Sequence, residues 1–102
     1  MDLKPGSRWK SAVCTTEVVV VRPPSAPGVL ECGGAPMVPH GTAVAPDAAP
    51  AAGRAAGSVV GKRYADAESG LEALCAKAGA GSLSLSGRAL VVRDAKKLPA
   101  SD

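Results

Sequence analysis

The chain has very few large apolar side chains from which a hydrophobic core could be built. Its 102 residues are 46% hydrophobic, but they include one Trp, one Tyr and no Phe. Most of the apolar content is Ala and Val, whose side chains bury little area each, and a domain of this length is already short of core. We therefore expect one small domain over residues 1–102, without a large catalytic cleft. Such a composition is typical of a high-GC bacterial genome.

Short runs of β-branched residues predict strands in the first part of the chain, residues 5–39. The four valines at 18–21 favour a strand, and the run is too short for a helix. A proline-rich loop over 23–28 follows, and residues 29–32 are predicted to return as the second strand of an antiparallel hairpin. Gly33 and Gly34 then predict a tight turn.

Residues 41–57 form a low-complexity segment of Ala, Pro and Gly. Pro46 and Pro50 interrupt any helix there. Nothing large is available to bury, so the entropy lost on ordering would go uncompensated. We expect a flexible linker or a long surface loop.

Residues 58–102 are expected to form further β-hairpins. Ser and Leu alternate over 82–86, the period of a half-buried strand, and a turn at Gly87 leads to a returning strand over 89–93. Residues 58–64 are a shorter strand candidate. The segment 71–78 fits either a helix or a strand, with the strand favoured, and the tail 96–102 is expected to be loose. The predicted fold class is all-β, a small antiparallel sheet or partial barrel.

Charge and composition exclude several classes of partner. The net charge is +3, and the twelve Lys and Arg residues are scattered along the chain. Nucleic-acid-binding domains usually carry a dense basic stripe and aromatic residues for stacking, so we expect no nucleic-acid partner. No apolar run approaches the length of about 20 residues that spans a membrane. Three cysteines, an odd number, favour a reducing compartment. The sequence predicts a soluble, cytoplasmic protein with no membrane partner.

Residues 5–39 also carry a set of motifs at a characteristic spacing. A Trp-Lys pair precedes Cys14, a Val-rich stretch follows, and residues 30–37 read Leu-Glu-Cys-Gly-Gly-Ala-Pro-Met. This third of the chain resembles desulforedoxin and the N-terminal module of desulfoferrodoxin. In that family a Tyr-Lys-Cys-x-x-Cys knuckle precedes a Val-rich strand, and a Leu-x-Cys-Cys-Gly-x-Pro-Met segment follows it. The resemblance implies a rubredoxin-like N-terminal hairpin.

Only half of that family's metal ligands are present. The family binds iron through four thiolates, whereas this sequence keeps Cys14 and Cys32 and has Ser11 and Gly33 in place of the other two. A tetrahedral thiolate site needs four ligands. The resemblance thus implies the fold, and the missing ligands argue against the family's iron-based redox role.

A different metal-ligand set can be drawn from the remaining residues. Cys14, Cys32, His40 and Cys75 make up a Cys3His set, an accepted zinc shell, and a structural zinc would help so small a core. Against this, Cys75 fits a small buried hydrophobe, and His40 lacks the close partner usual in zinc spacing. We expect no bound cofactor and keep zinc or iron as the alternative.

Cys14 and Cys32 should lie close together if the knuckle fold is retained, because thiolate ligands of one metal sit within about 4 Å of each other. A Cys14–Cys32 disulfide, or a pair that switches between the dithiol and the disulfide, would then be geometrically plausible. Two reduced, packed thiols are the expected state in the cytosol. A catalytic dyad of a cysteine with His40, oriented by Asp47, would stand in a Pro/Ala-rich loop and is not favoured.

Other charged and glycine-rich segments are interpreted as surface features. Asp66, Glu68 and Glu72 fit solvated turn and strand positions. The basic pair at 62–63 and the glycines at 78–81 lack the strand–loop–helix context of a phosphate site.

The function class favoured by the sequence is a non-catalytic accessory or protein-interaction domain, for instance a small subunit of a larger enzyme or a self-associating chain. Its partner surface is assigned to Trp9, Met37 and Val38, which are expected to be exposed. No catalytic residue is assigned. The alternative is a metal-binding or thiol redox protein that uses the three cysteines and His40.

Overall fold

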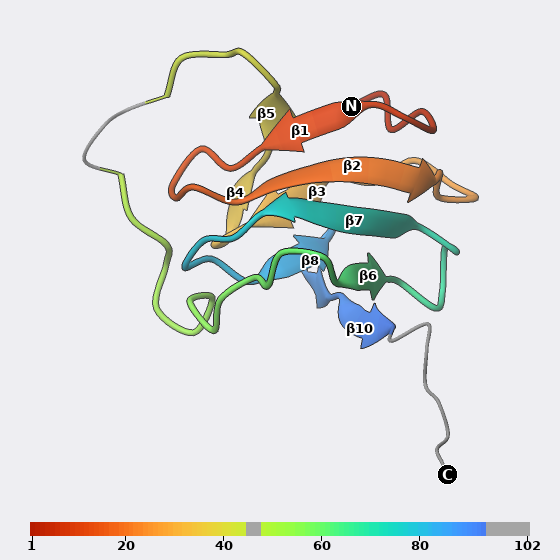
Figure 1. Ribbon diagram of the computed structural model, residues 1–102. Coiled ribbons are helices and arrows are strands. Elements are labelled where there is room, and N and C mark those ends of the chain that lie inside the picture. Colours follow the sequence, from red (N-terminus) through yellow and green to blue (C-terminus); the bar gives the residue numbers. More distant parts are fainter. Residues whose placement is uncertain (45–47, 94–102) are drawn as a thin grey trace, which may run out of the picture.

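The described residues of the computed structural model, 1–44 and 48–93, contain ten β-strands and no helix (Figure 1). In chain order the strands are Arg8–Lys10 (β1), Glu17–Arg22 (β2), Leu30–Cys32 (β3), Ala35–Pro36 (β4), Val38–Pro39 (β5), Arg63–Ala65 (β6), Glu72–Lys77 (β7), Leu83–Leu85 (β8), Arg88–Ala89 (β9) and Val91–Arg93 (β10). The predicted all-β class is confirmed.

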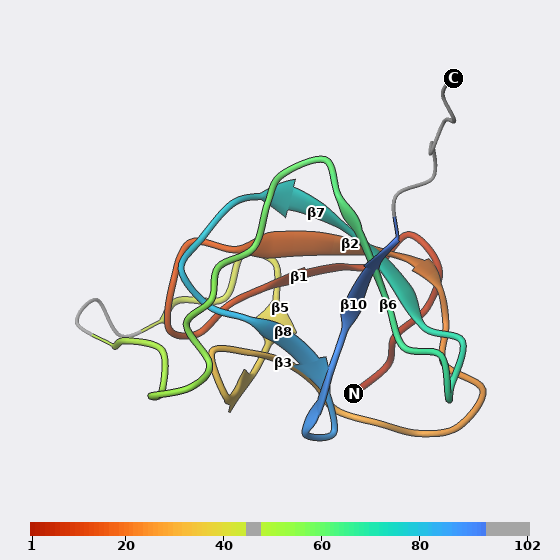
Figure 2. The same cartoon turned by 90° about the horizontal axis from the view of Figure 1, so that it is seen from below.

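The strands divide between two antiparallel sheets. The larger sheet has the order β10-β6-β7-β2-β1-β5, and the smaller has the order β4-β3-β8-β9. The two longest strands, β2 and β7, lie side by side in the middle of the larger sheet and pair from Glu17↔Lys77 to Arg22↔Glu72. In Figure 2, β2 and β7 lie on one side of the molecule and β3 and β8 of the smaller sheet lie on the other.

The core lies between these two sheets. Val18 and Val20 on β2 are each 1% exposed, whereas Val21 is 43% exposed, because successive side chains on a strand point to opposite faces. β3 and β8 contribute Leu30 and Leu85 from the smaller sheet. The buried cluster comprises Leu3, Trp9, Val18, Val20, Leu30, Cys32, Met37, Tyr64, Leu71, Ala73, Cys75, Leu83 and Leu85.

The strands β2 and β3 form where the sequence predicts them, but the hairpin expected between them is wrong. β2 pairs with β1 and β7, and β3 pairs with β4 and β8. Pro23 and Pro24 directly follow β2 and have no amide N–H to donate to a ladder. The proline-rich loop therefore ends one strand and carries the chain from the larger sheet to the smaller one.

Gly33 and Gly34 form the predicted tight turn. They connect β3 to β4 across the pair Cys32↔Ala35, and their φ angles are 66° and 85°. A two-residue hairpin turn with positive φ at both positions is the type I′ turn, which glycine adopts without a steric penalty.

The C-terminal hairpin forms, with β8 where the Ser/Leu alternation predicts a strand, but its returning strand is split in two. β8 pairs with β9 across Ser86 and Gly87, but β10 then crosses to pair with β6 in the larger sheet. The ambiguous segment 71–78 is a strand, as favoured. Gly61 interrupts the strand expected over 58–64, since its φ of 85° belongs to a turn, and only the last part of that segment joins β6.

Of the two alternatives for the Ala/Pro-rich segment, a flexible linker or a long surface loop, residues 48–57 form the loop, and backbone hydrogen bonds attach it to both sheet-forming neighbours. The N–H of Ala51 donates to the carbonyl oxygen of Gly33 at 2.9 Å, and the N–H of Ser82 donates to that of Arg54 at 2.8 Å. The N–H of Ala56 donates to Oγ of Ser82 at 2.8 Å. Residues 48–57 are thus held against the β3–β4 turn and the start of β8. Asp47 and the tail 96–102 lie outside the described residues.

Leu30, the first residue of β3, and Val29, which precedes it, test where the core lies because one is buried and the other exposed. Leu30 is 0% exposed and Val29 is 39% exposed. Leu30→Ala should lower the free energy of unfolding by about 2–5 kcal/mol, because it leaves a cavity between the sheets. Val29→Ala should change it by about 0.5 kcal/mol or less. Urea unfolding measures both, and equal effects would contradict this core.

Candidate thiol site

Cys14 and Cys32 bring two sulfur atoms together where the two sheets meet. Cys14 lies in the loop between β1 and β2 of the larger sheet, and Cys32 is the last residue of β3 in the smaller sheet. Their Sγ atoms are 3.7 Å apart and both thiols are free. Cys32 is 0% exposed, whereas Cys14 is partly exposed. The proximity expected from the sequence is confirmed.

Ser11 shapes the loop that presents Cys14. This serine is 0% exposed, and its Oγ accepts hydrogen bonds from the N–H groups of Val13 and Cys14, each at 3.0 Å. The N–H of Ser11 donates to the carbonyl oxygen of Thr16 at 2.8 Å and closes the loop. At the position where the resemblance implies a metal ligand, this chain therefore has a hydroxyl group that organises the backbone.

The connection from β7 to β8 passes directly against the two sulfur atoms. A Cβ atom on Gly81 would lie 2.8 Å from Sγ of Cys32 and 3.2 Å from Sγ of Cys14. One on Gly79 would lie 3.0 Å from Sγ of Cys14 and 2.5 Å from the backbone nitrogen of Thr16. No side chain fits at either position without displacing its neighbours. The glycines that the sequence analysis interpreted as a surface turn thus form one wall of the site.

Polar groups converge on the sulfur of Cys14. The N–H of Gly81 donates to Sγ of Cys14 at 3.4 Å, and Oγ1 of Thr16 lies 3.3 Å from the same sulfur. Burial raises the pKa of Cys14, but hydrogen bonds from Ser11, Thr16 and Gly81 outweigh it and lower the pKa from 9.0 to about 7. The Cys14 thiol therefore ionises at a lower pH than an ordinary cysteine.

Cys32 has the opposite character. Burial, together with repulsion from Cys14, raises the pKa of its thiol to about 11, against the hydrogen bonds from Ser11 and Thr16 that lower it. Near neutral pH the Cys32 thiol keeps its proton. The pair thus combines an accessible, partly ionised sulfur with a buried, protonated one.

Cys75 and His40 do not join this pair. Sγ of Cys75 donates to the carbonyl oxygen of Lys77 at 3.3 Å, and burial raises the pKa of this thiol, as is typical of an inert packed cysteine. Nδ1 of His40 lies 3.4 Å from Oε1 of Glu17. Over residues 1–44 and 48–93, no three His, Cys, Asp or Glu side chains gather around a possible metal position. The four-residue zinc set considered from the sequence is not assembled in this part of the chain.

Two of the three residues assigned to a partner surface are in the core, so the expectation that they are exposed is wrong. Trp9 is 9% exposed and Met37 is 2% exposed, while Val38 on β5 is half-buried. Nε1 of Trp9 donates to Oγ of Ser7 at 3.0 Å, so its polar atom is satisfied in this position. A chain with so few large apolar side chains needs them between its sheets.

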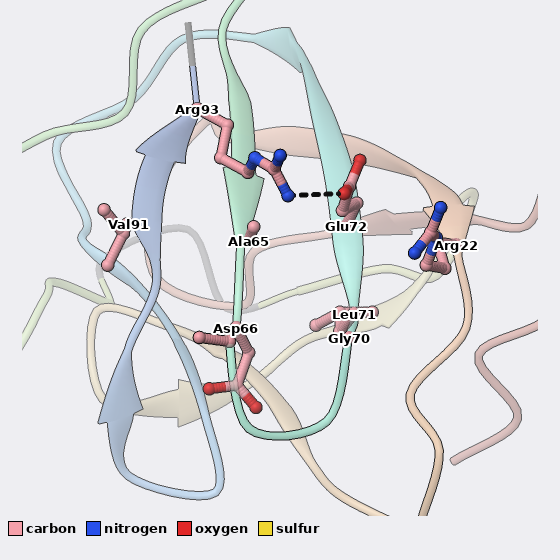
Figure 3. Close-up of a pocket in the computed structure, with 9 residues that line it drawn as sticks. Arg22, Ala65, Asp66, Gly70, Leu71, Glu72, Val91 and Arg93 are labelled. Carbon is pink, nitrogen blue, oxygen red and sulfur yellow. Dashed lines mark hydrogen bonds and ion pairs between the residues drawn. The ribbon is translucent and has the colours of Figure 1, made fainter. Parts of the chain in front are cut away.

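A groove of about 510 Å³ beside β6, β7 and β10 contains two acidic residues that the sequence analysis placed in solvent (Figure 3). Asp66 is 5% exposed and Glu72 is 8% exposed. Glu72 pairs with Arg93 at 3.1 Å, the dashed line in Figure 3, and with Arg63 at 3.7 Å. These pairs connect β7 to its neighbour β6 and to β10, the strand beyond it, so the buried carboxylate has partners within the sheet.

Arg88 holds the second buried carboxylate. Its Nη2 lies 2.8 Å from Oδ2 of Asp66 and its Nε lies 3.3 Å from Oδ1. Oγ of Ser69 donates to Oδ2 at 2.7 Å. The hydrogen bonds from Arg88, and then those from Ser69, hold the pKa of Asp66 well below its usual range. The sequence analysis missed this pair because its partners are 22 residues apart.

The chain matches no family model, and no curated protein or solved structure matches it significantly. Its chemistry is therefore inferred from its own geometry. In the described part of the chain, no helix is long and apolar enough to cross a membrane.

Gly81→Ala tests the close wall of the site. The added Cβ would meet both sulfur atoms, so the free energy of unfolding of the reduced protein should fall by about 1–3 kcal/mol. Ala80→Ser, at the exposed neighbouring position, should change it by about 0.5 kcal/mol or less. Chemical unfolding measures both variants. A Gly81→Ala protein as stable as the wild type would mean that the backbone does not press on the sulfur pair.

Asp66→Asn tests the buried ion pair through its pH dependence. Because the folded-state pKa of Asp66 is depressed, its stabilising contribution is present above pH 3.8, its ordinary pKa, and is lost as the pH falls. The variant should therefore be less stable than the wild type near neutral pH and lose less stability on acidification. Glu68→Gln is the control. Glu68 contacts the same arginine, at 3.8 Å, but its side chain is 73% exposed, so its removal should have little effect on the pH profile. Parallel pH profiles for Asp66→Asn and the wild type would refute this role.

Proposed function

We propose that the protein is a thiol–disulfide redox protein in which Cys14 attacks a disulfide and Cys32 resolves the product. The observation that carries the proposal is the pair of Sγ atoms at 3.7 Å, one partly exposed and surrounded by hydrogen-bond donors that lower its pKa, the other buried with a raised pKa. A thiol attacks disulfides best when its pKa is close to the ambient pH, which is the case for Cys14.

In the first step, the Cys14 thiolate attacks one sulfur of a disulfide substrate. A bond forms between Sγ of Cys14 and that sulfur, the substrate's S–S bond breaks, and its second sulfur leaves as a thiolate. The N–H of Gly81 and the hydroxyl groups of Ser11 and Thr16 stabilise the attacking anion beforehand. The partial exposure of Cys14 gives the substrate access.

In the second step, Cys32 attacks Sγ of Cys14. The Cys32 thiol gives its proton to the departed thiolate or to water, the Cys14–Cys32 bond forms, and the remaining substrate sulfur leaves as a thiolate. Since an S–S bond is about 2.05 Å long, the two sulfurs must approach by about 1.7 Å. The protein's dithiol is oxidised to a disulfide, and the substrate disulfide is reduced to two thiols.

The product disulfide would connect the two sheets. Cys14 and Cys32 are 18 residues apart, and closing a loop of about this length stabilises a fold by roughly 3 kcal/mol in the chain-entropy model. The oxidised form is thus expected to unfold at a higher denaturant concentration. In the reducing cytoplasm expected from the sequence, the resting form would be the dithiol.

The other functions considered from the sequence have less support. An accessory or interaction role stays a prediction, now without the exposed Trp9 and Met37 on which it was based. A zinc or iron centre would need two ligands besides Cys14 and Cys32, from beyond the described residues or from a second copy.

Disulfide exchange with single-cysteine variants tests the proposal. The reduced wild type treated with oxidised glutathione should lose two hydrogens and form the Cys14–Cys32 disulfide. Cys32→Ser should accumulate a mixed disulfide on Cys14, and Cys14→Ser should react at least about tenfold more slowly, because Cys32 is buried and protonated. Mass spectrometry identifies each product, and Cys75→Ala is the control expected to behave as the wild type.

The pH dependence of the first step provides an independent criterion. Its rate should rise with a midpoint near pH 7, following the ionisation of Cys14. A midpoint at 9.0 or above, or equal reactivity of Cys14→Ser and the wild type, would overturn the proposal.

A further inference from the structure

Cys14 opens onto a small pocket of about 210 Å³ that two lysines help to line. The strand register explains their position. Lys10 on β1 and Lys77 on β7 both lie opposite Glu17 on β2, so the three charged residues form one row across the larger sheet. This row stands beside the loop that carries Cys14, and all four residues line the pocket.

The charges of this pocket are unequal. In the part of the chain that the structure describes, neither lysine makes an ion pair, while Oε1 of Glu17 lies 3.4 Å from Nδ1 of His40. Two ammonium groups thus oppose one carboxylate, so the charged side chains of the lining carry an excess of positive charge. Thr15 and Val44 complete much of the lining and add no charge.

The pocket is too small for a drug-sized ligand. Pockets for such ligands measure about 300–1,000 Å³, whereas this one measures about 210 Å³. It can hold one arm of a small disulfide, with the arm's sulfur against Sγ of Cys14 and the rest of the molecule in solvent. The group on that arm would lie beside the side chains of Lys10 and Lys77.

We propose that the disulfide substrate of Cys14 is a small acidic one, with a carboxylate on the arm that enters this pocket. The inference rests on the proposed function and adds its substrate class. A carboxylate near an attacking thiolate normally slows exchange, because like charges repel. Lys10 and Lys77 offset this repulsion and raise the local concentration of the anion.

Three small disulfides that differ in charge test this selectivity. The probes are 3,3′-dithiodipropionic acid, which is anionic, 2-hydroxyethyl disulfide, which is neutral, and cystamine, which is cationic. Each rate with the Cys32→Ser protein, which stops at the mixed disulfide, is divided by the rate of the same probe with N-acetylcysteinamide, a thiol without a carboxylate, so that intrinsic reactivity cancels. The anionic probe should be favoured over the neutral one by about 3-fold to 10-fold at low salt. The preference should vanish near 1 M salt, where the Debye length is about 3 Å.

Lysine variants assign the preference to the pocket. Lys10→Gln and Lys77→Gln should each lower the rate with the anionic probe more than the rate with the neutral probe, and so remove part of the preference. Lys4→Gln is the matched control, since Lys4 lies outside the pocket and pairs with Asp2 at 3.4 Å.

The outcomes separate the two proposals. If all three probes react with Cys14 at equal normalised rates, the acidic-substrate inference is overturned and the redox function stands. If the lysine variants slow every probe alike, the lysines act on the Cys14 thiolate and not on the substrate's charge. That result also overturns the acidic-substrate inference and leaves the redox function standing. If no probe reacts with Cys14, both proposals fail.

Discussion

The close approach of the β7–β8 backbone to the sulfurs of Cys14 and Cys32 is the contact on which the site depends. Three segments meet there: a loop of the larger sheet, the end of β3 in the smaller sheet, and the connection that crosses between them. Gly79 and Gly81 make this possible, because a Cβ on either would overlap a sulfur or the backbone of Thr16. The absence of a Cβ at both glycines therefore allows this connection to pass directly against the two sulfur atoms.

The unequal acidity of the two thiols follows from the same contact. The backbone N–H of Gly81 points at Cys14, together with the hydroxyl groups of Ser11 and Thr16, and these donors favour its anion. Cys32 lies deeper between the sheets, where burial disfavours a second negative charge. One sulfur thus becomes the nucleophile and the other the resolving thiol.

Local features of this fold could be predicted from the sequence, and long-range ones could not. The valine run of β2 and the turn at Gly33 depend on neighbouring residues only. Which strands pair depends on where the proline-rich loop sends the chain, and no local pattern specifies that. Burial of Trp9 was missed for a similar reason: it depends on the scarcity of other large residues. The proximity of the two cysteines was expected from a family resemblance, and that resemblance itself stays a prediction. The role of Gly81 could be found only in the structure, because its contacts are with residues far away in the sequence.

The separation of the two sulfurs in the reduced protein is the quantity on which this account depends most directly. A high-resolution crystal structure of the reduced chain measures it. The account predicts Sγ atoms about 3.7 Å apart, with the N–H of Gly81 directed at Cys14. Cα atoms of Cys14 and Cys32 more than about 7 Å apart could not be bridged without moving the backbone, and that result would contradict it.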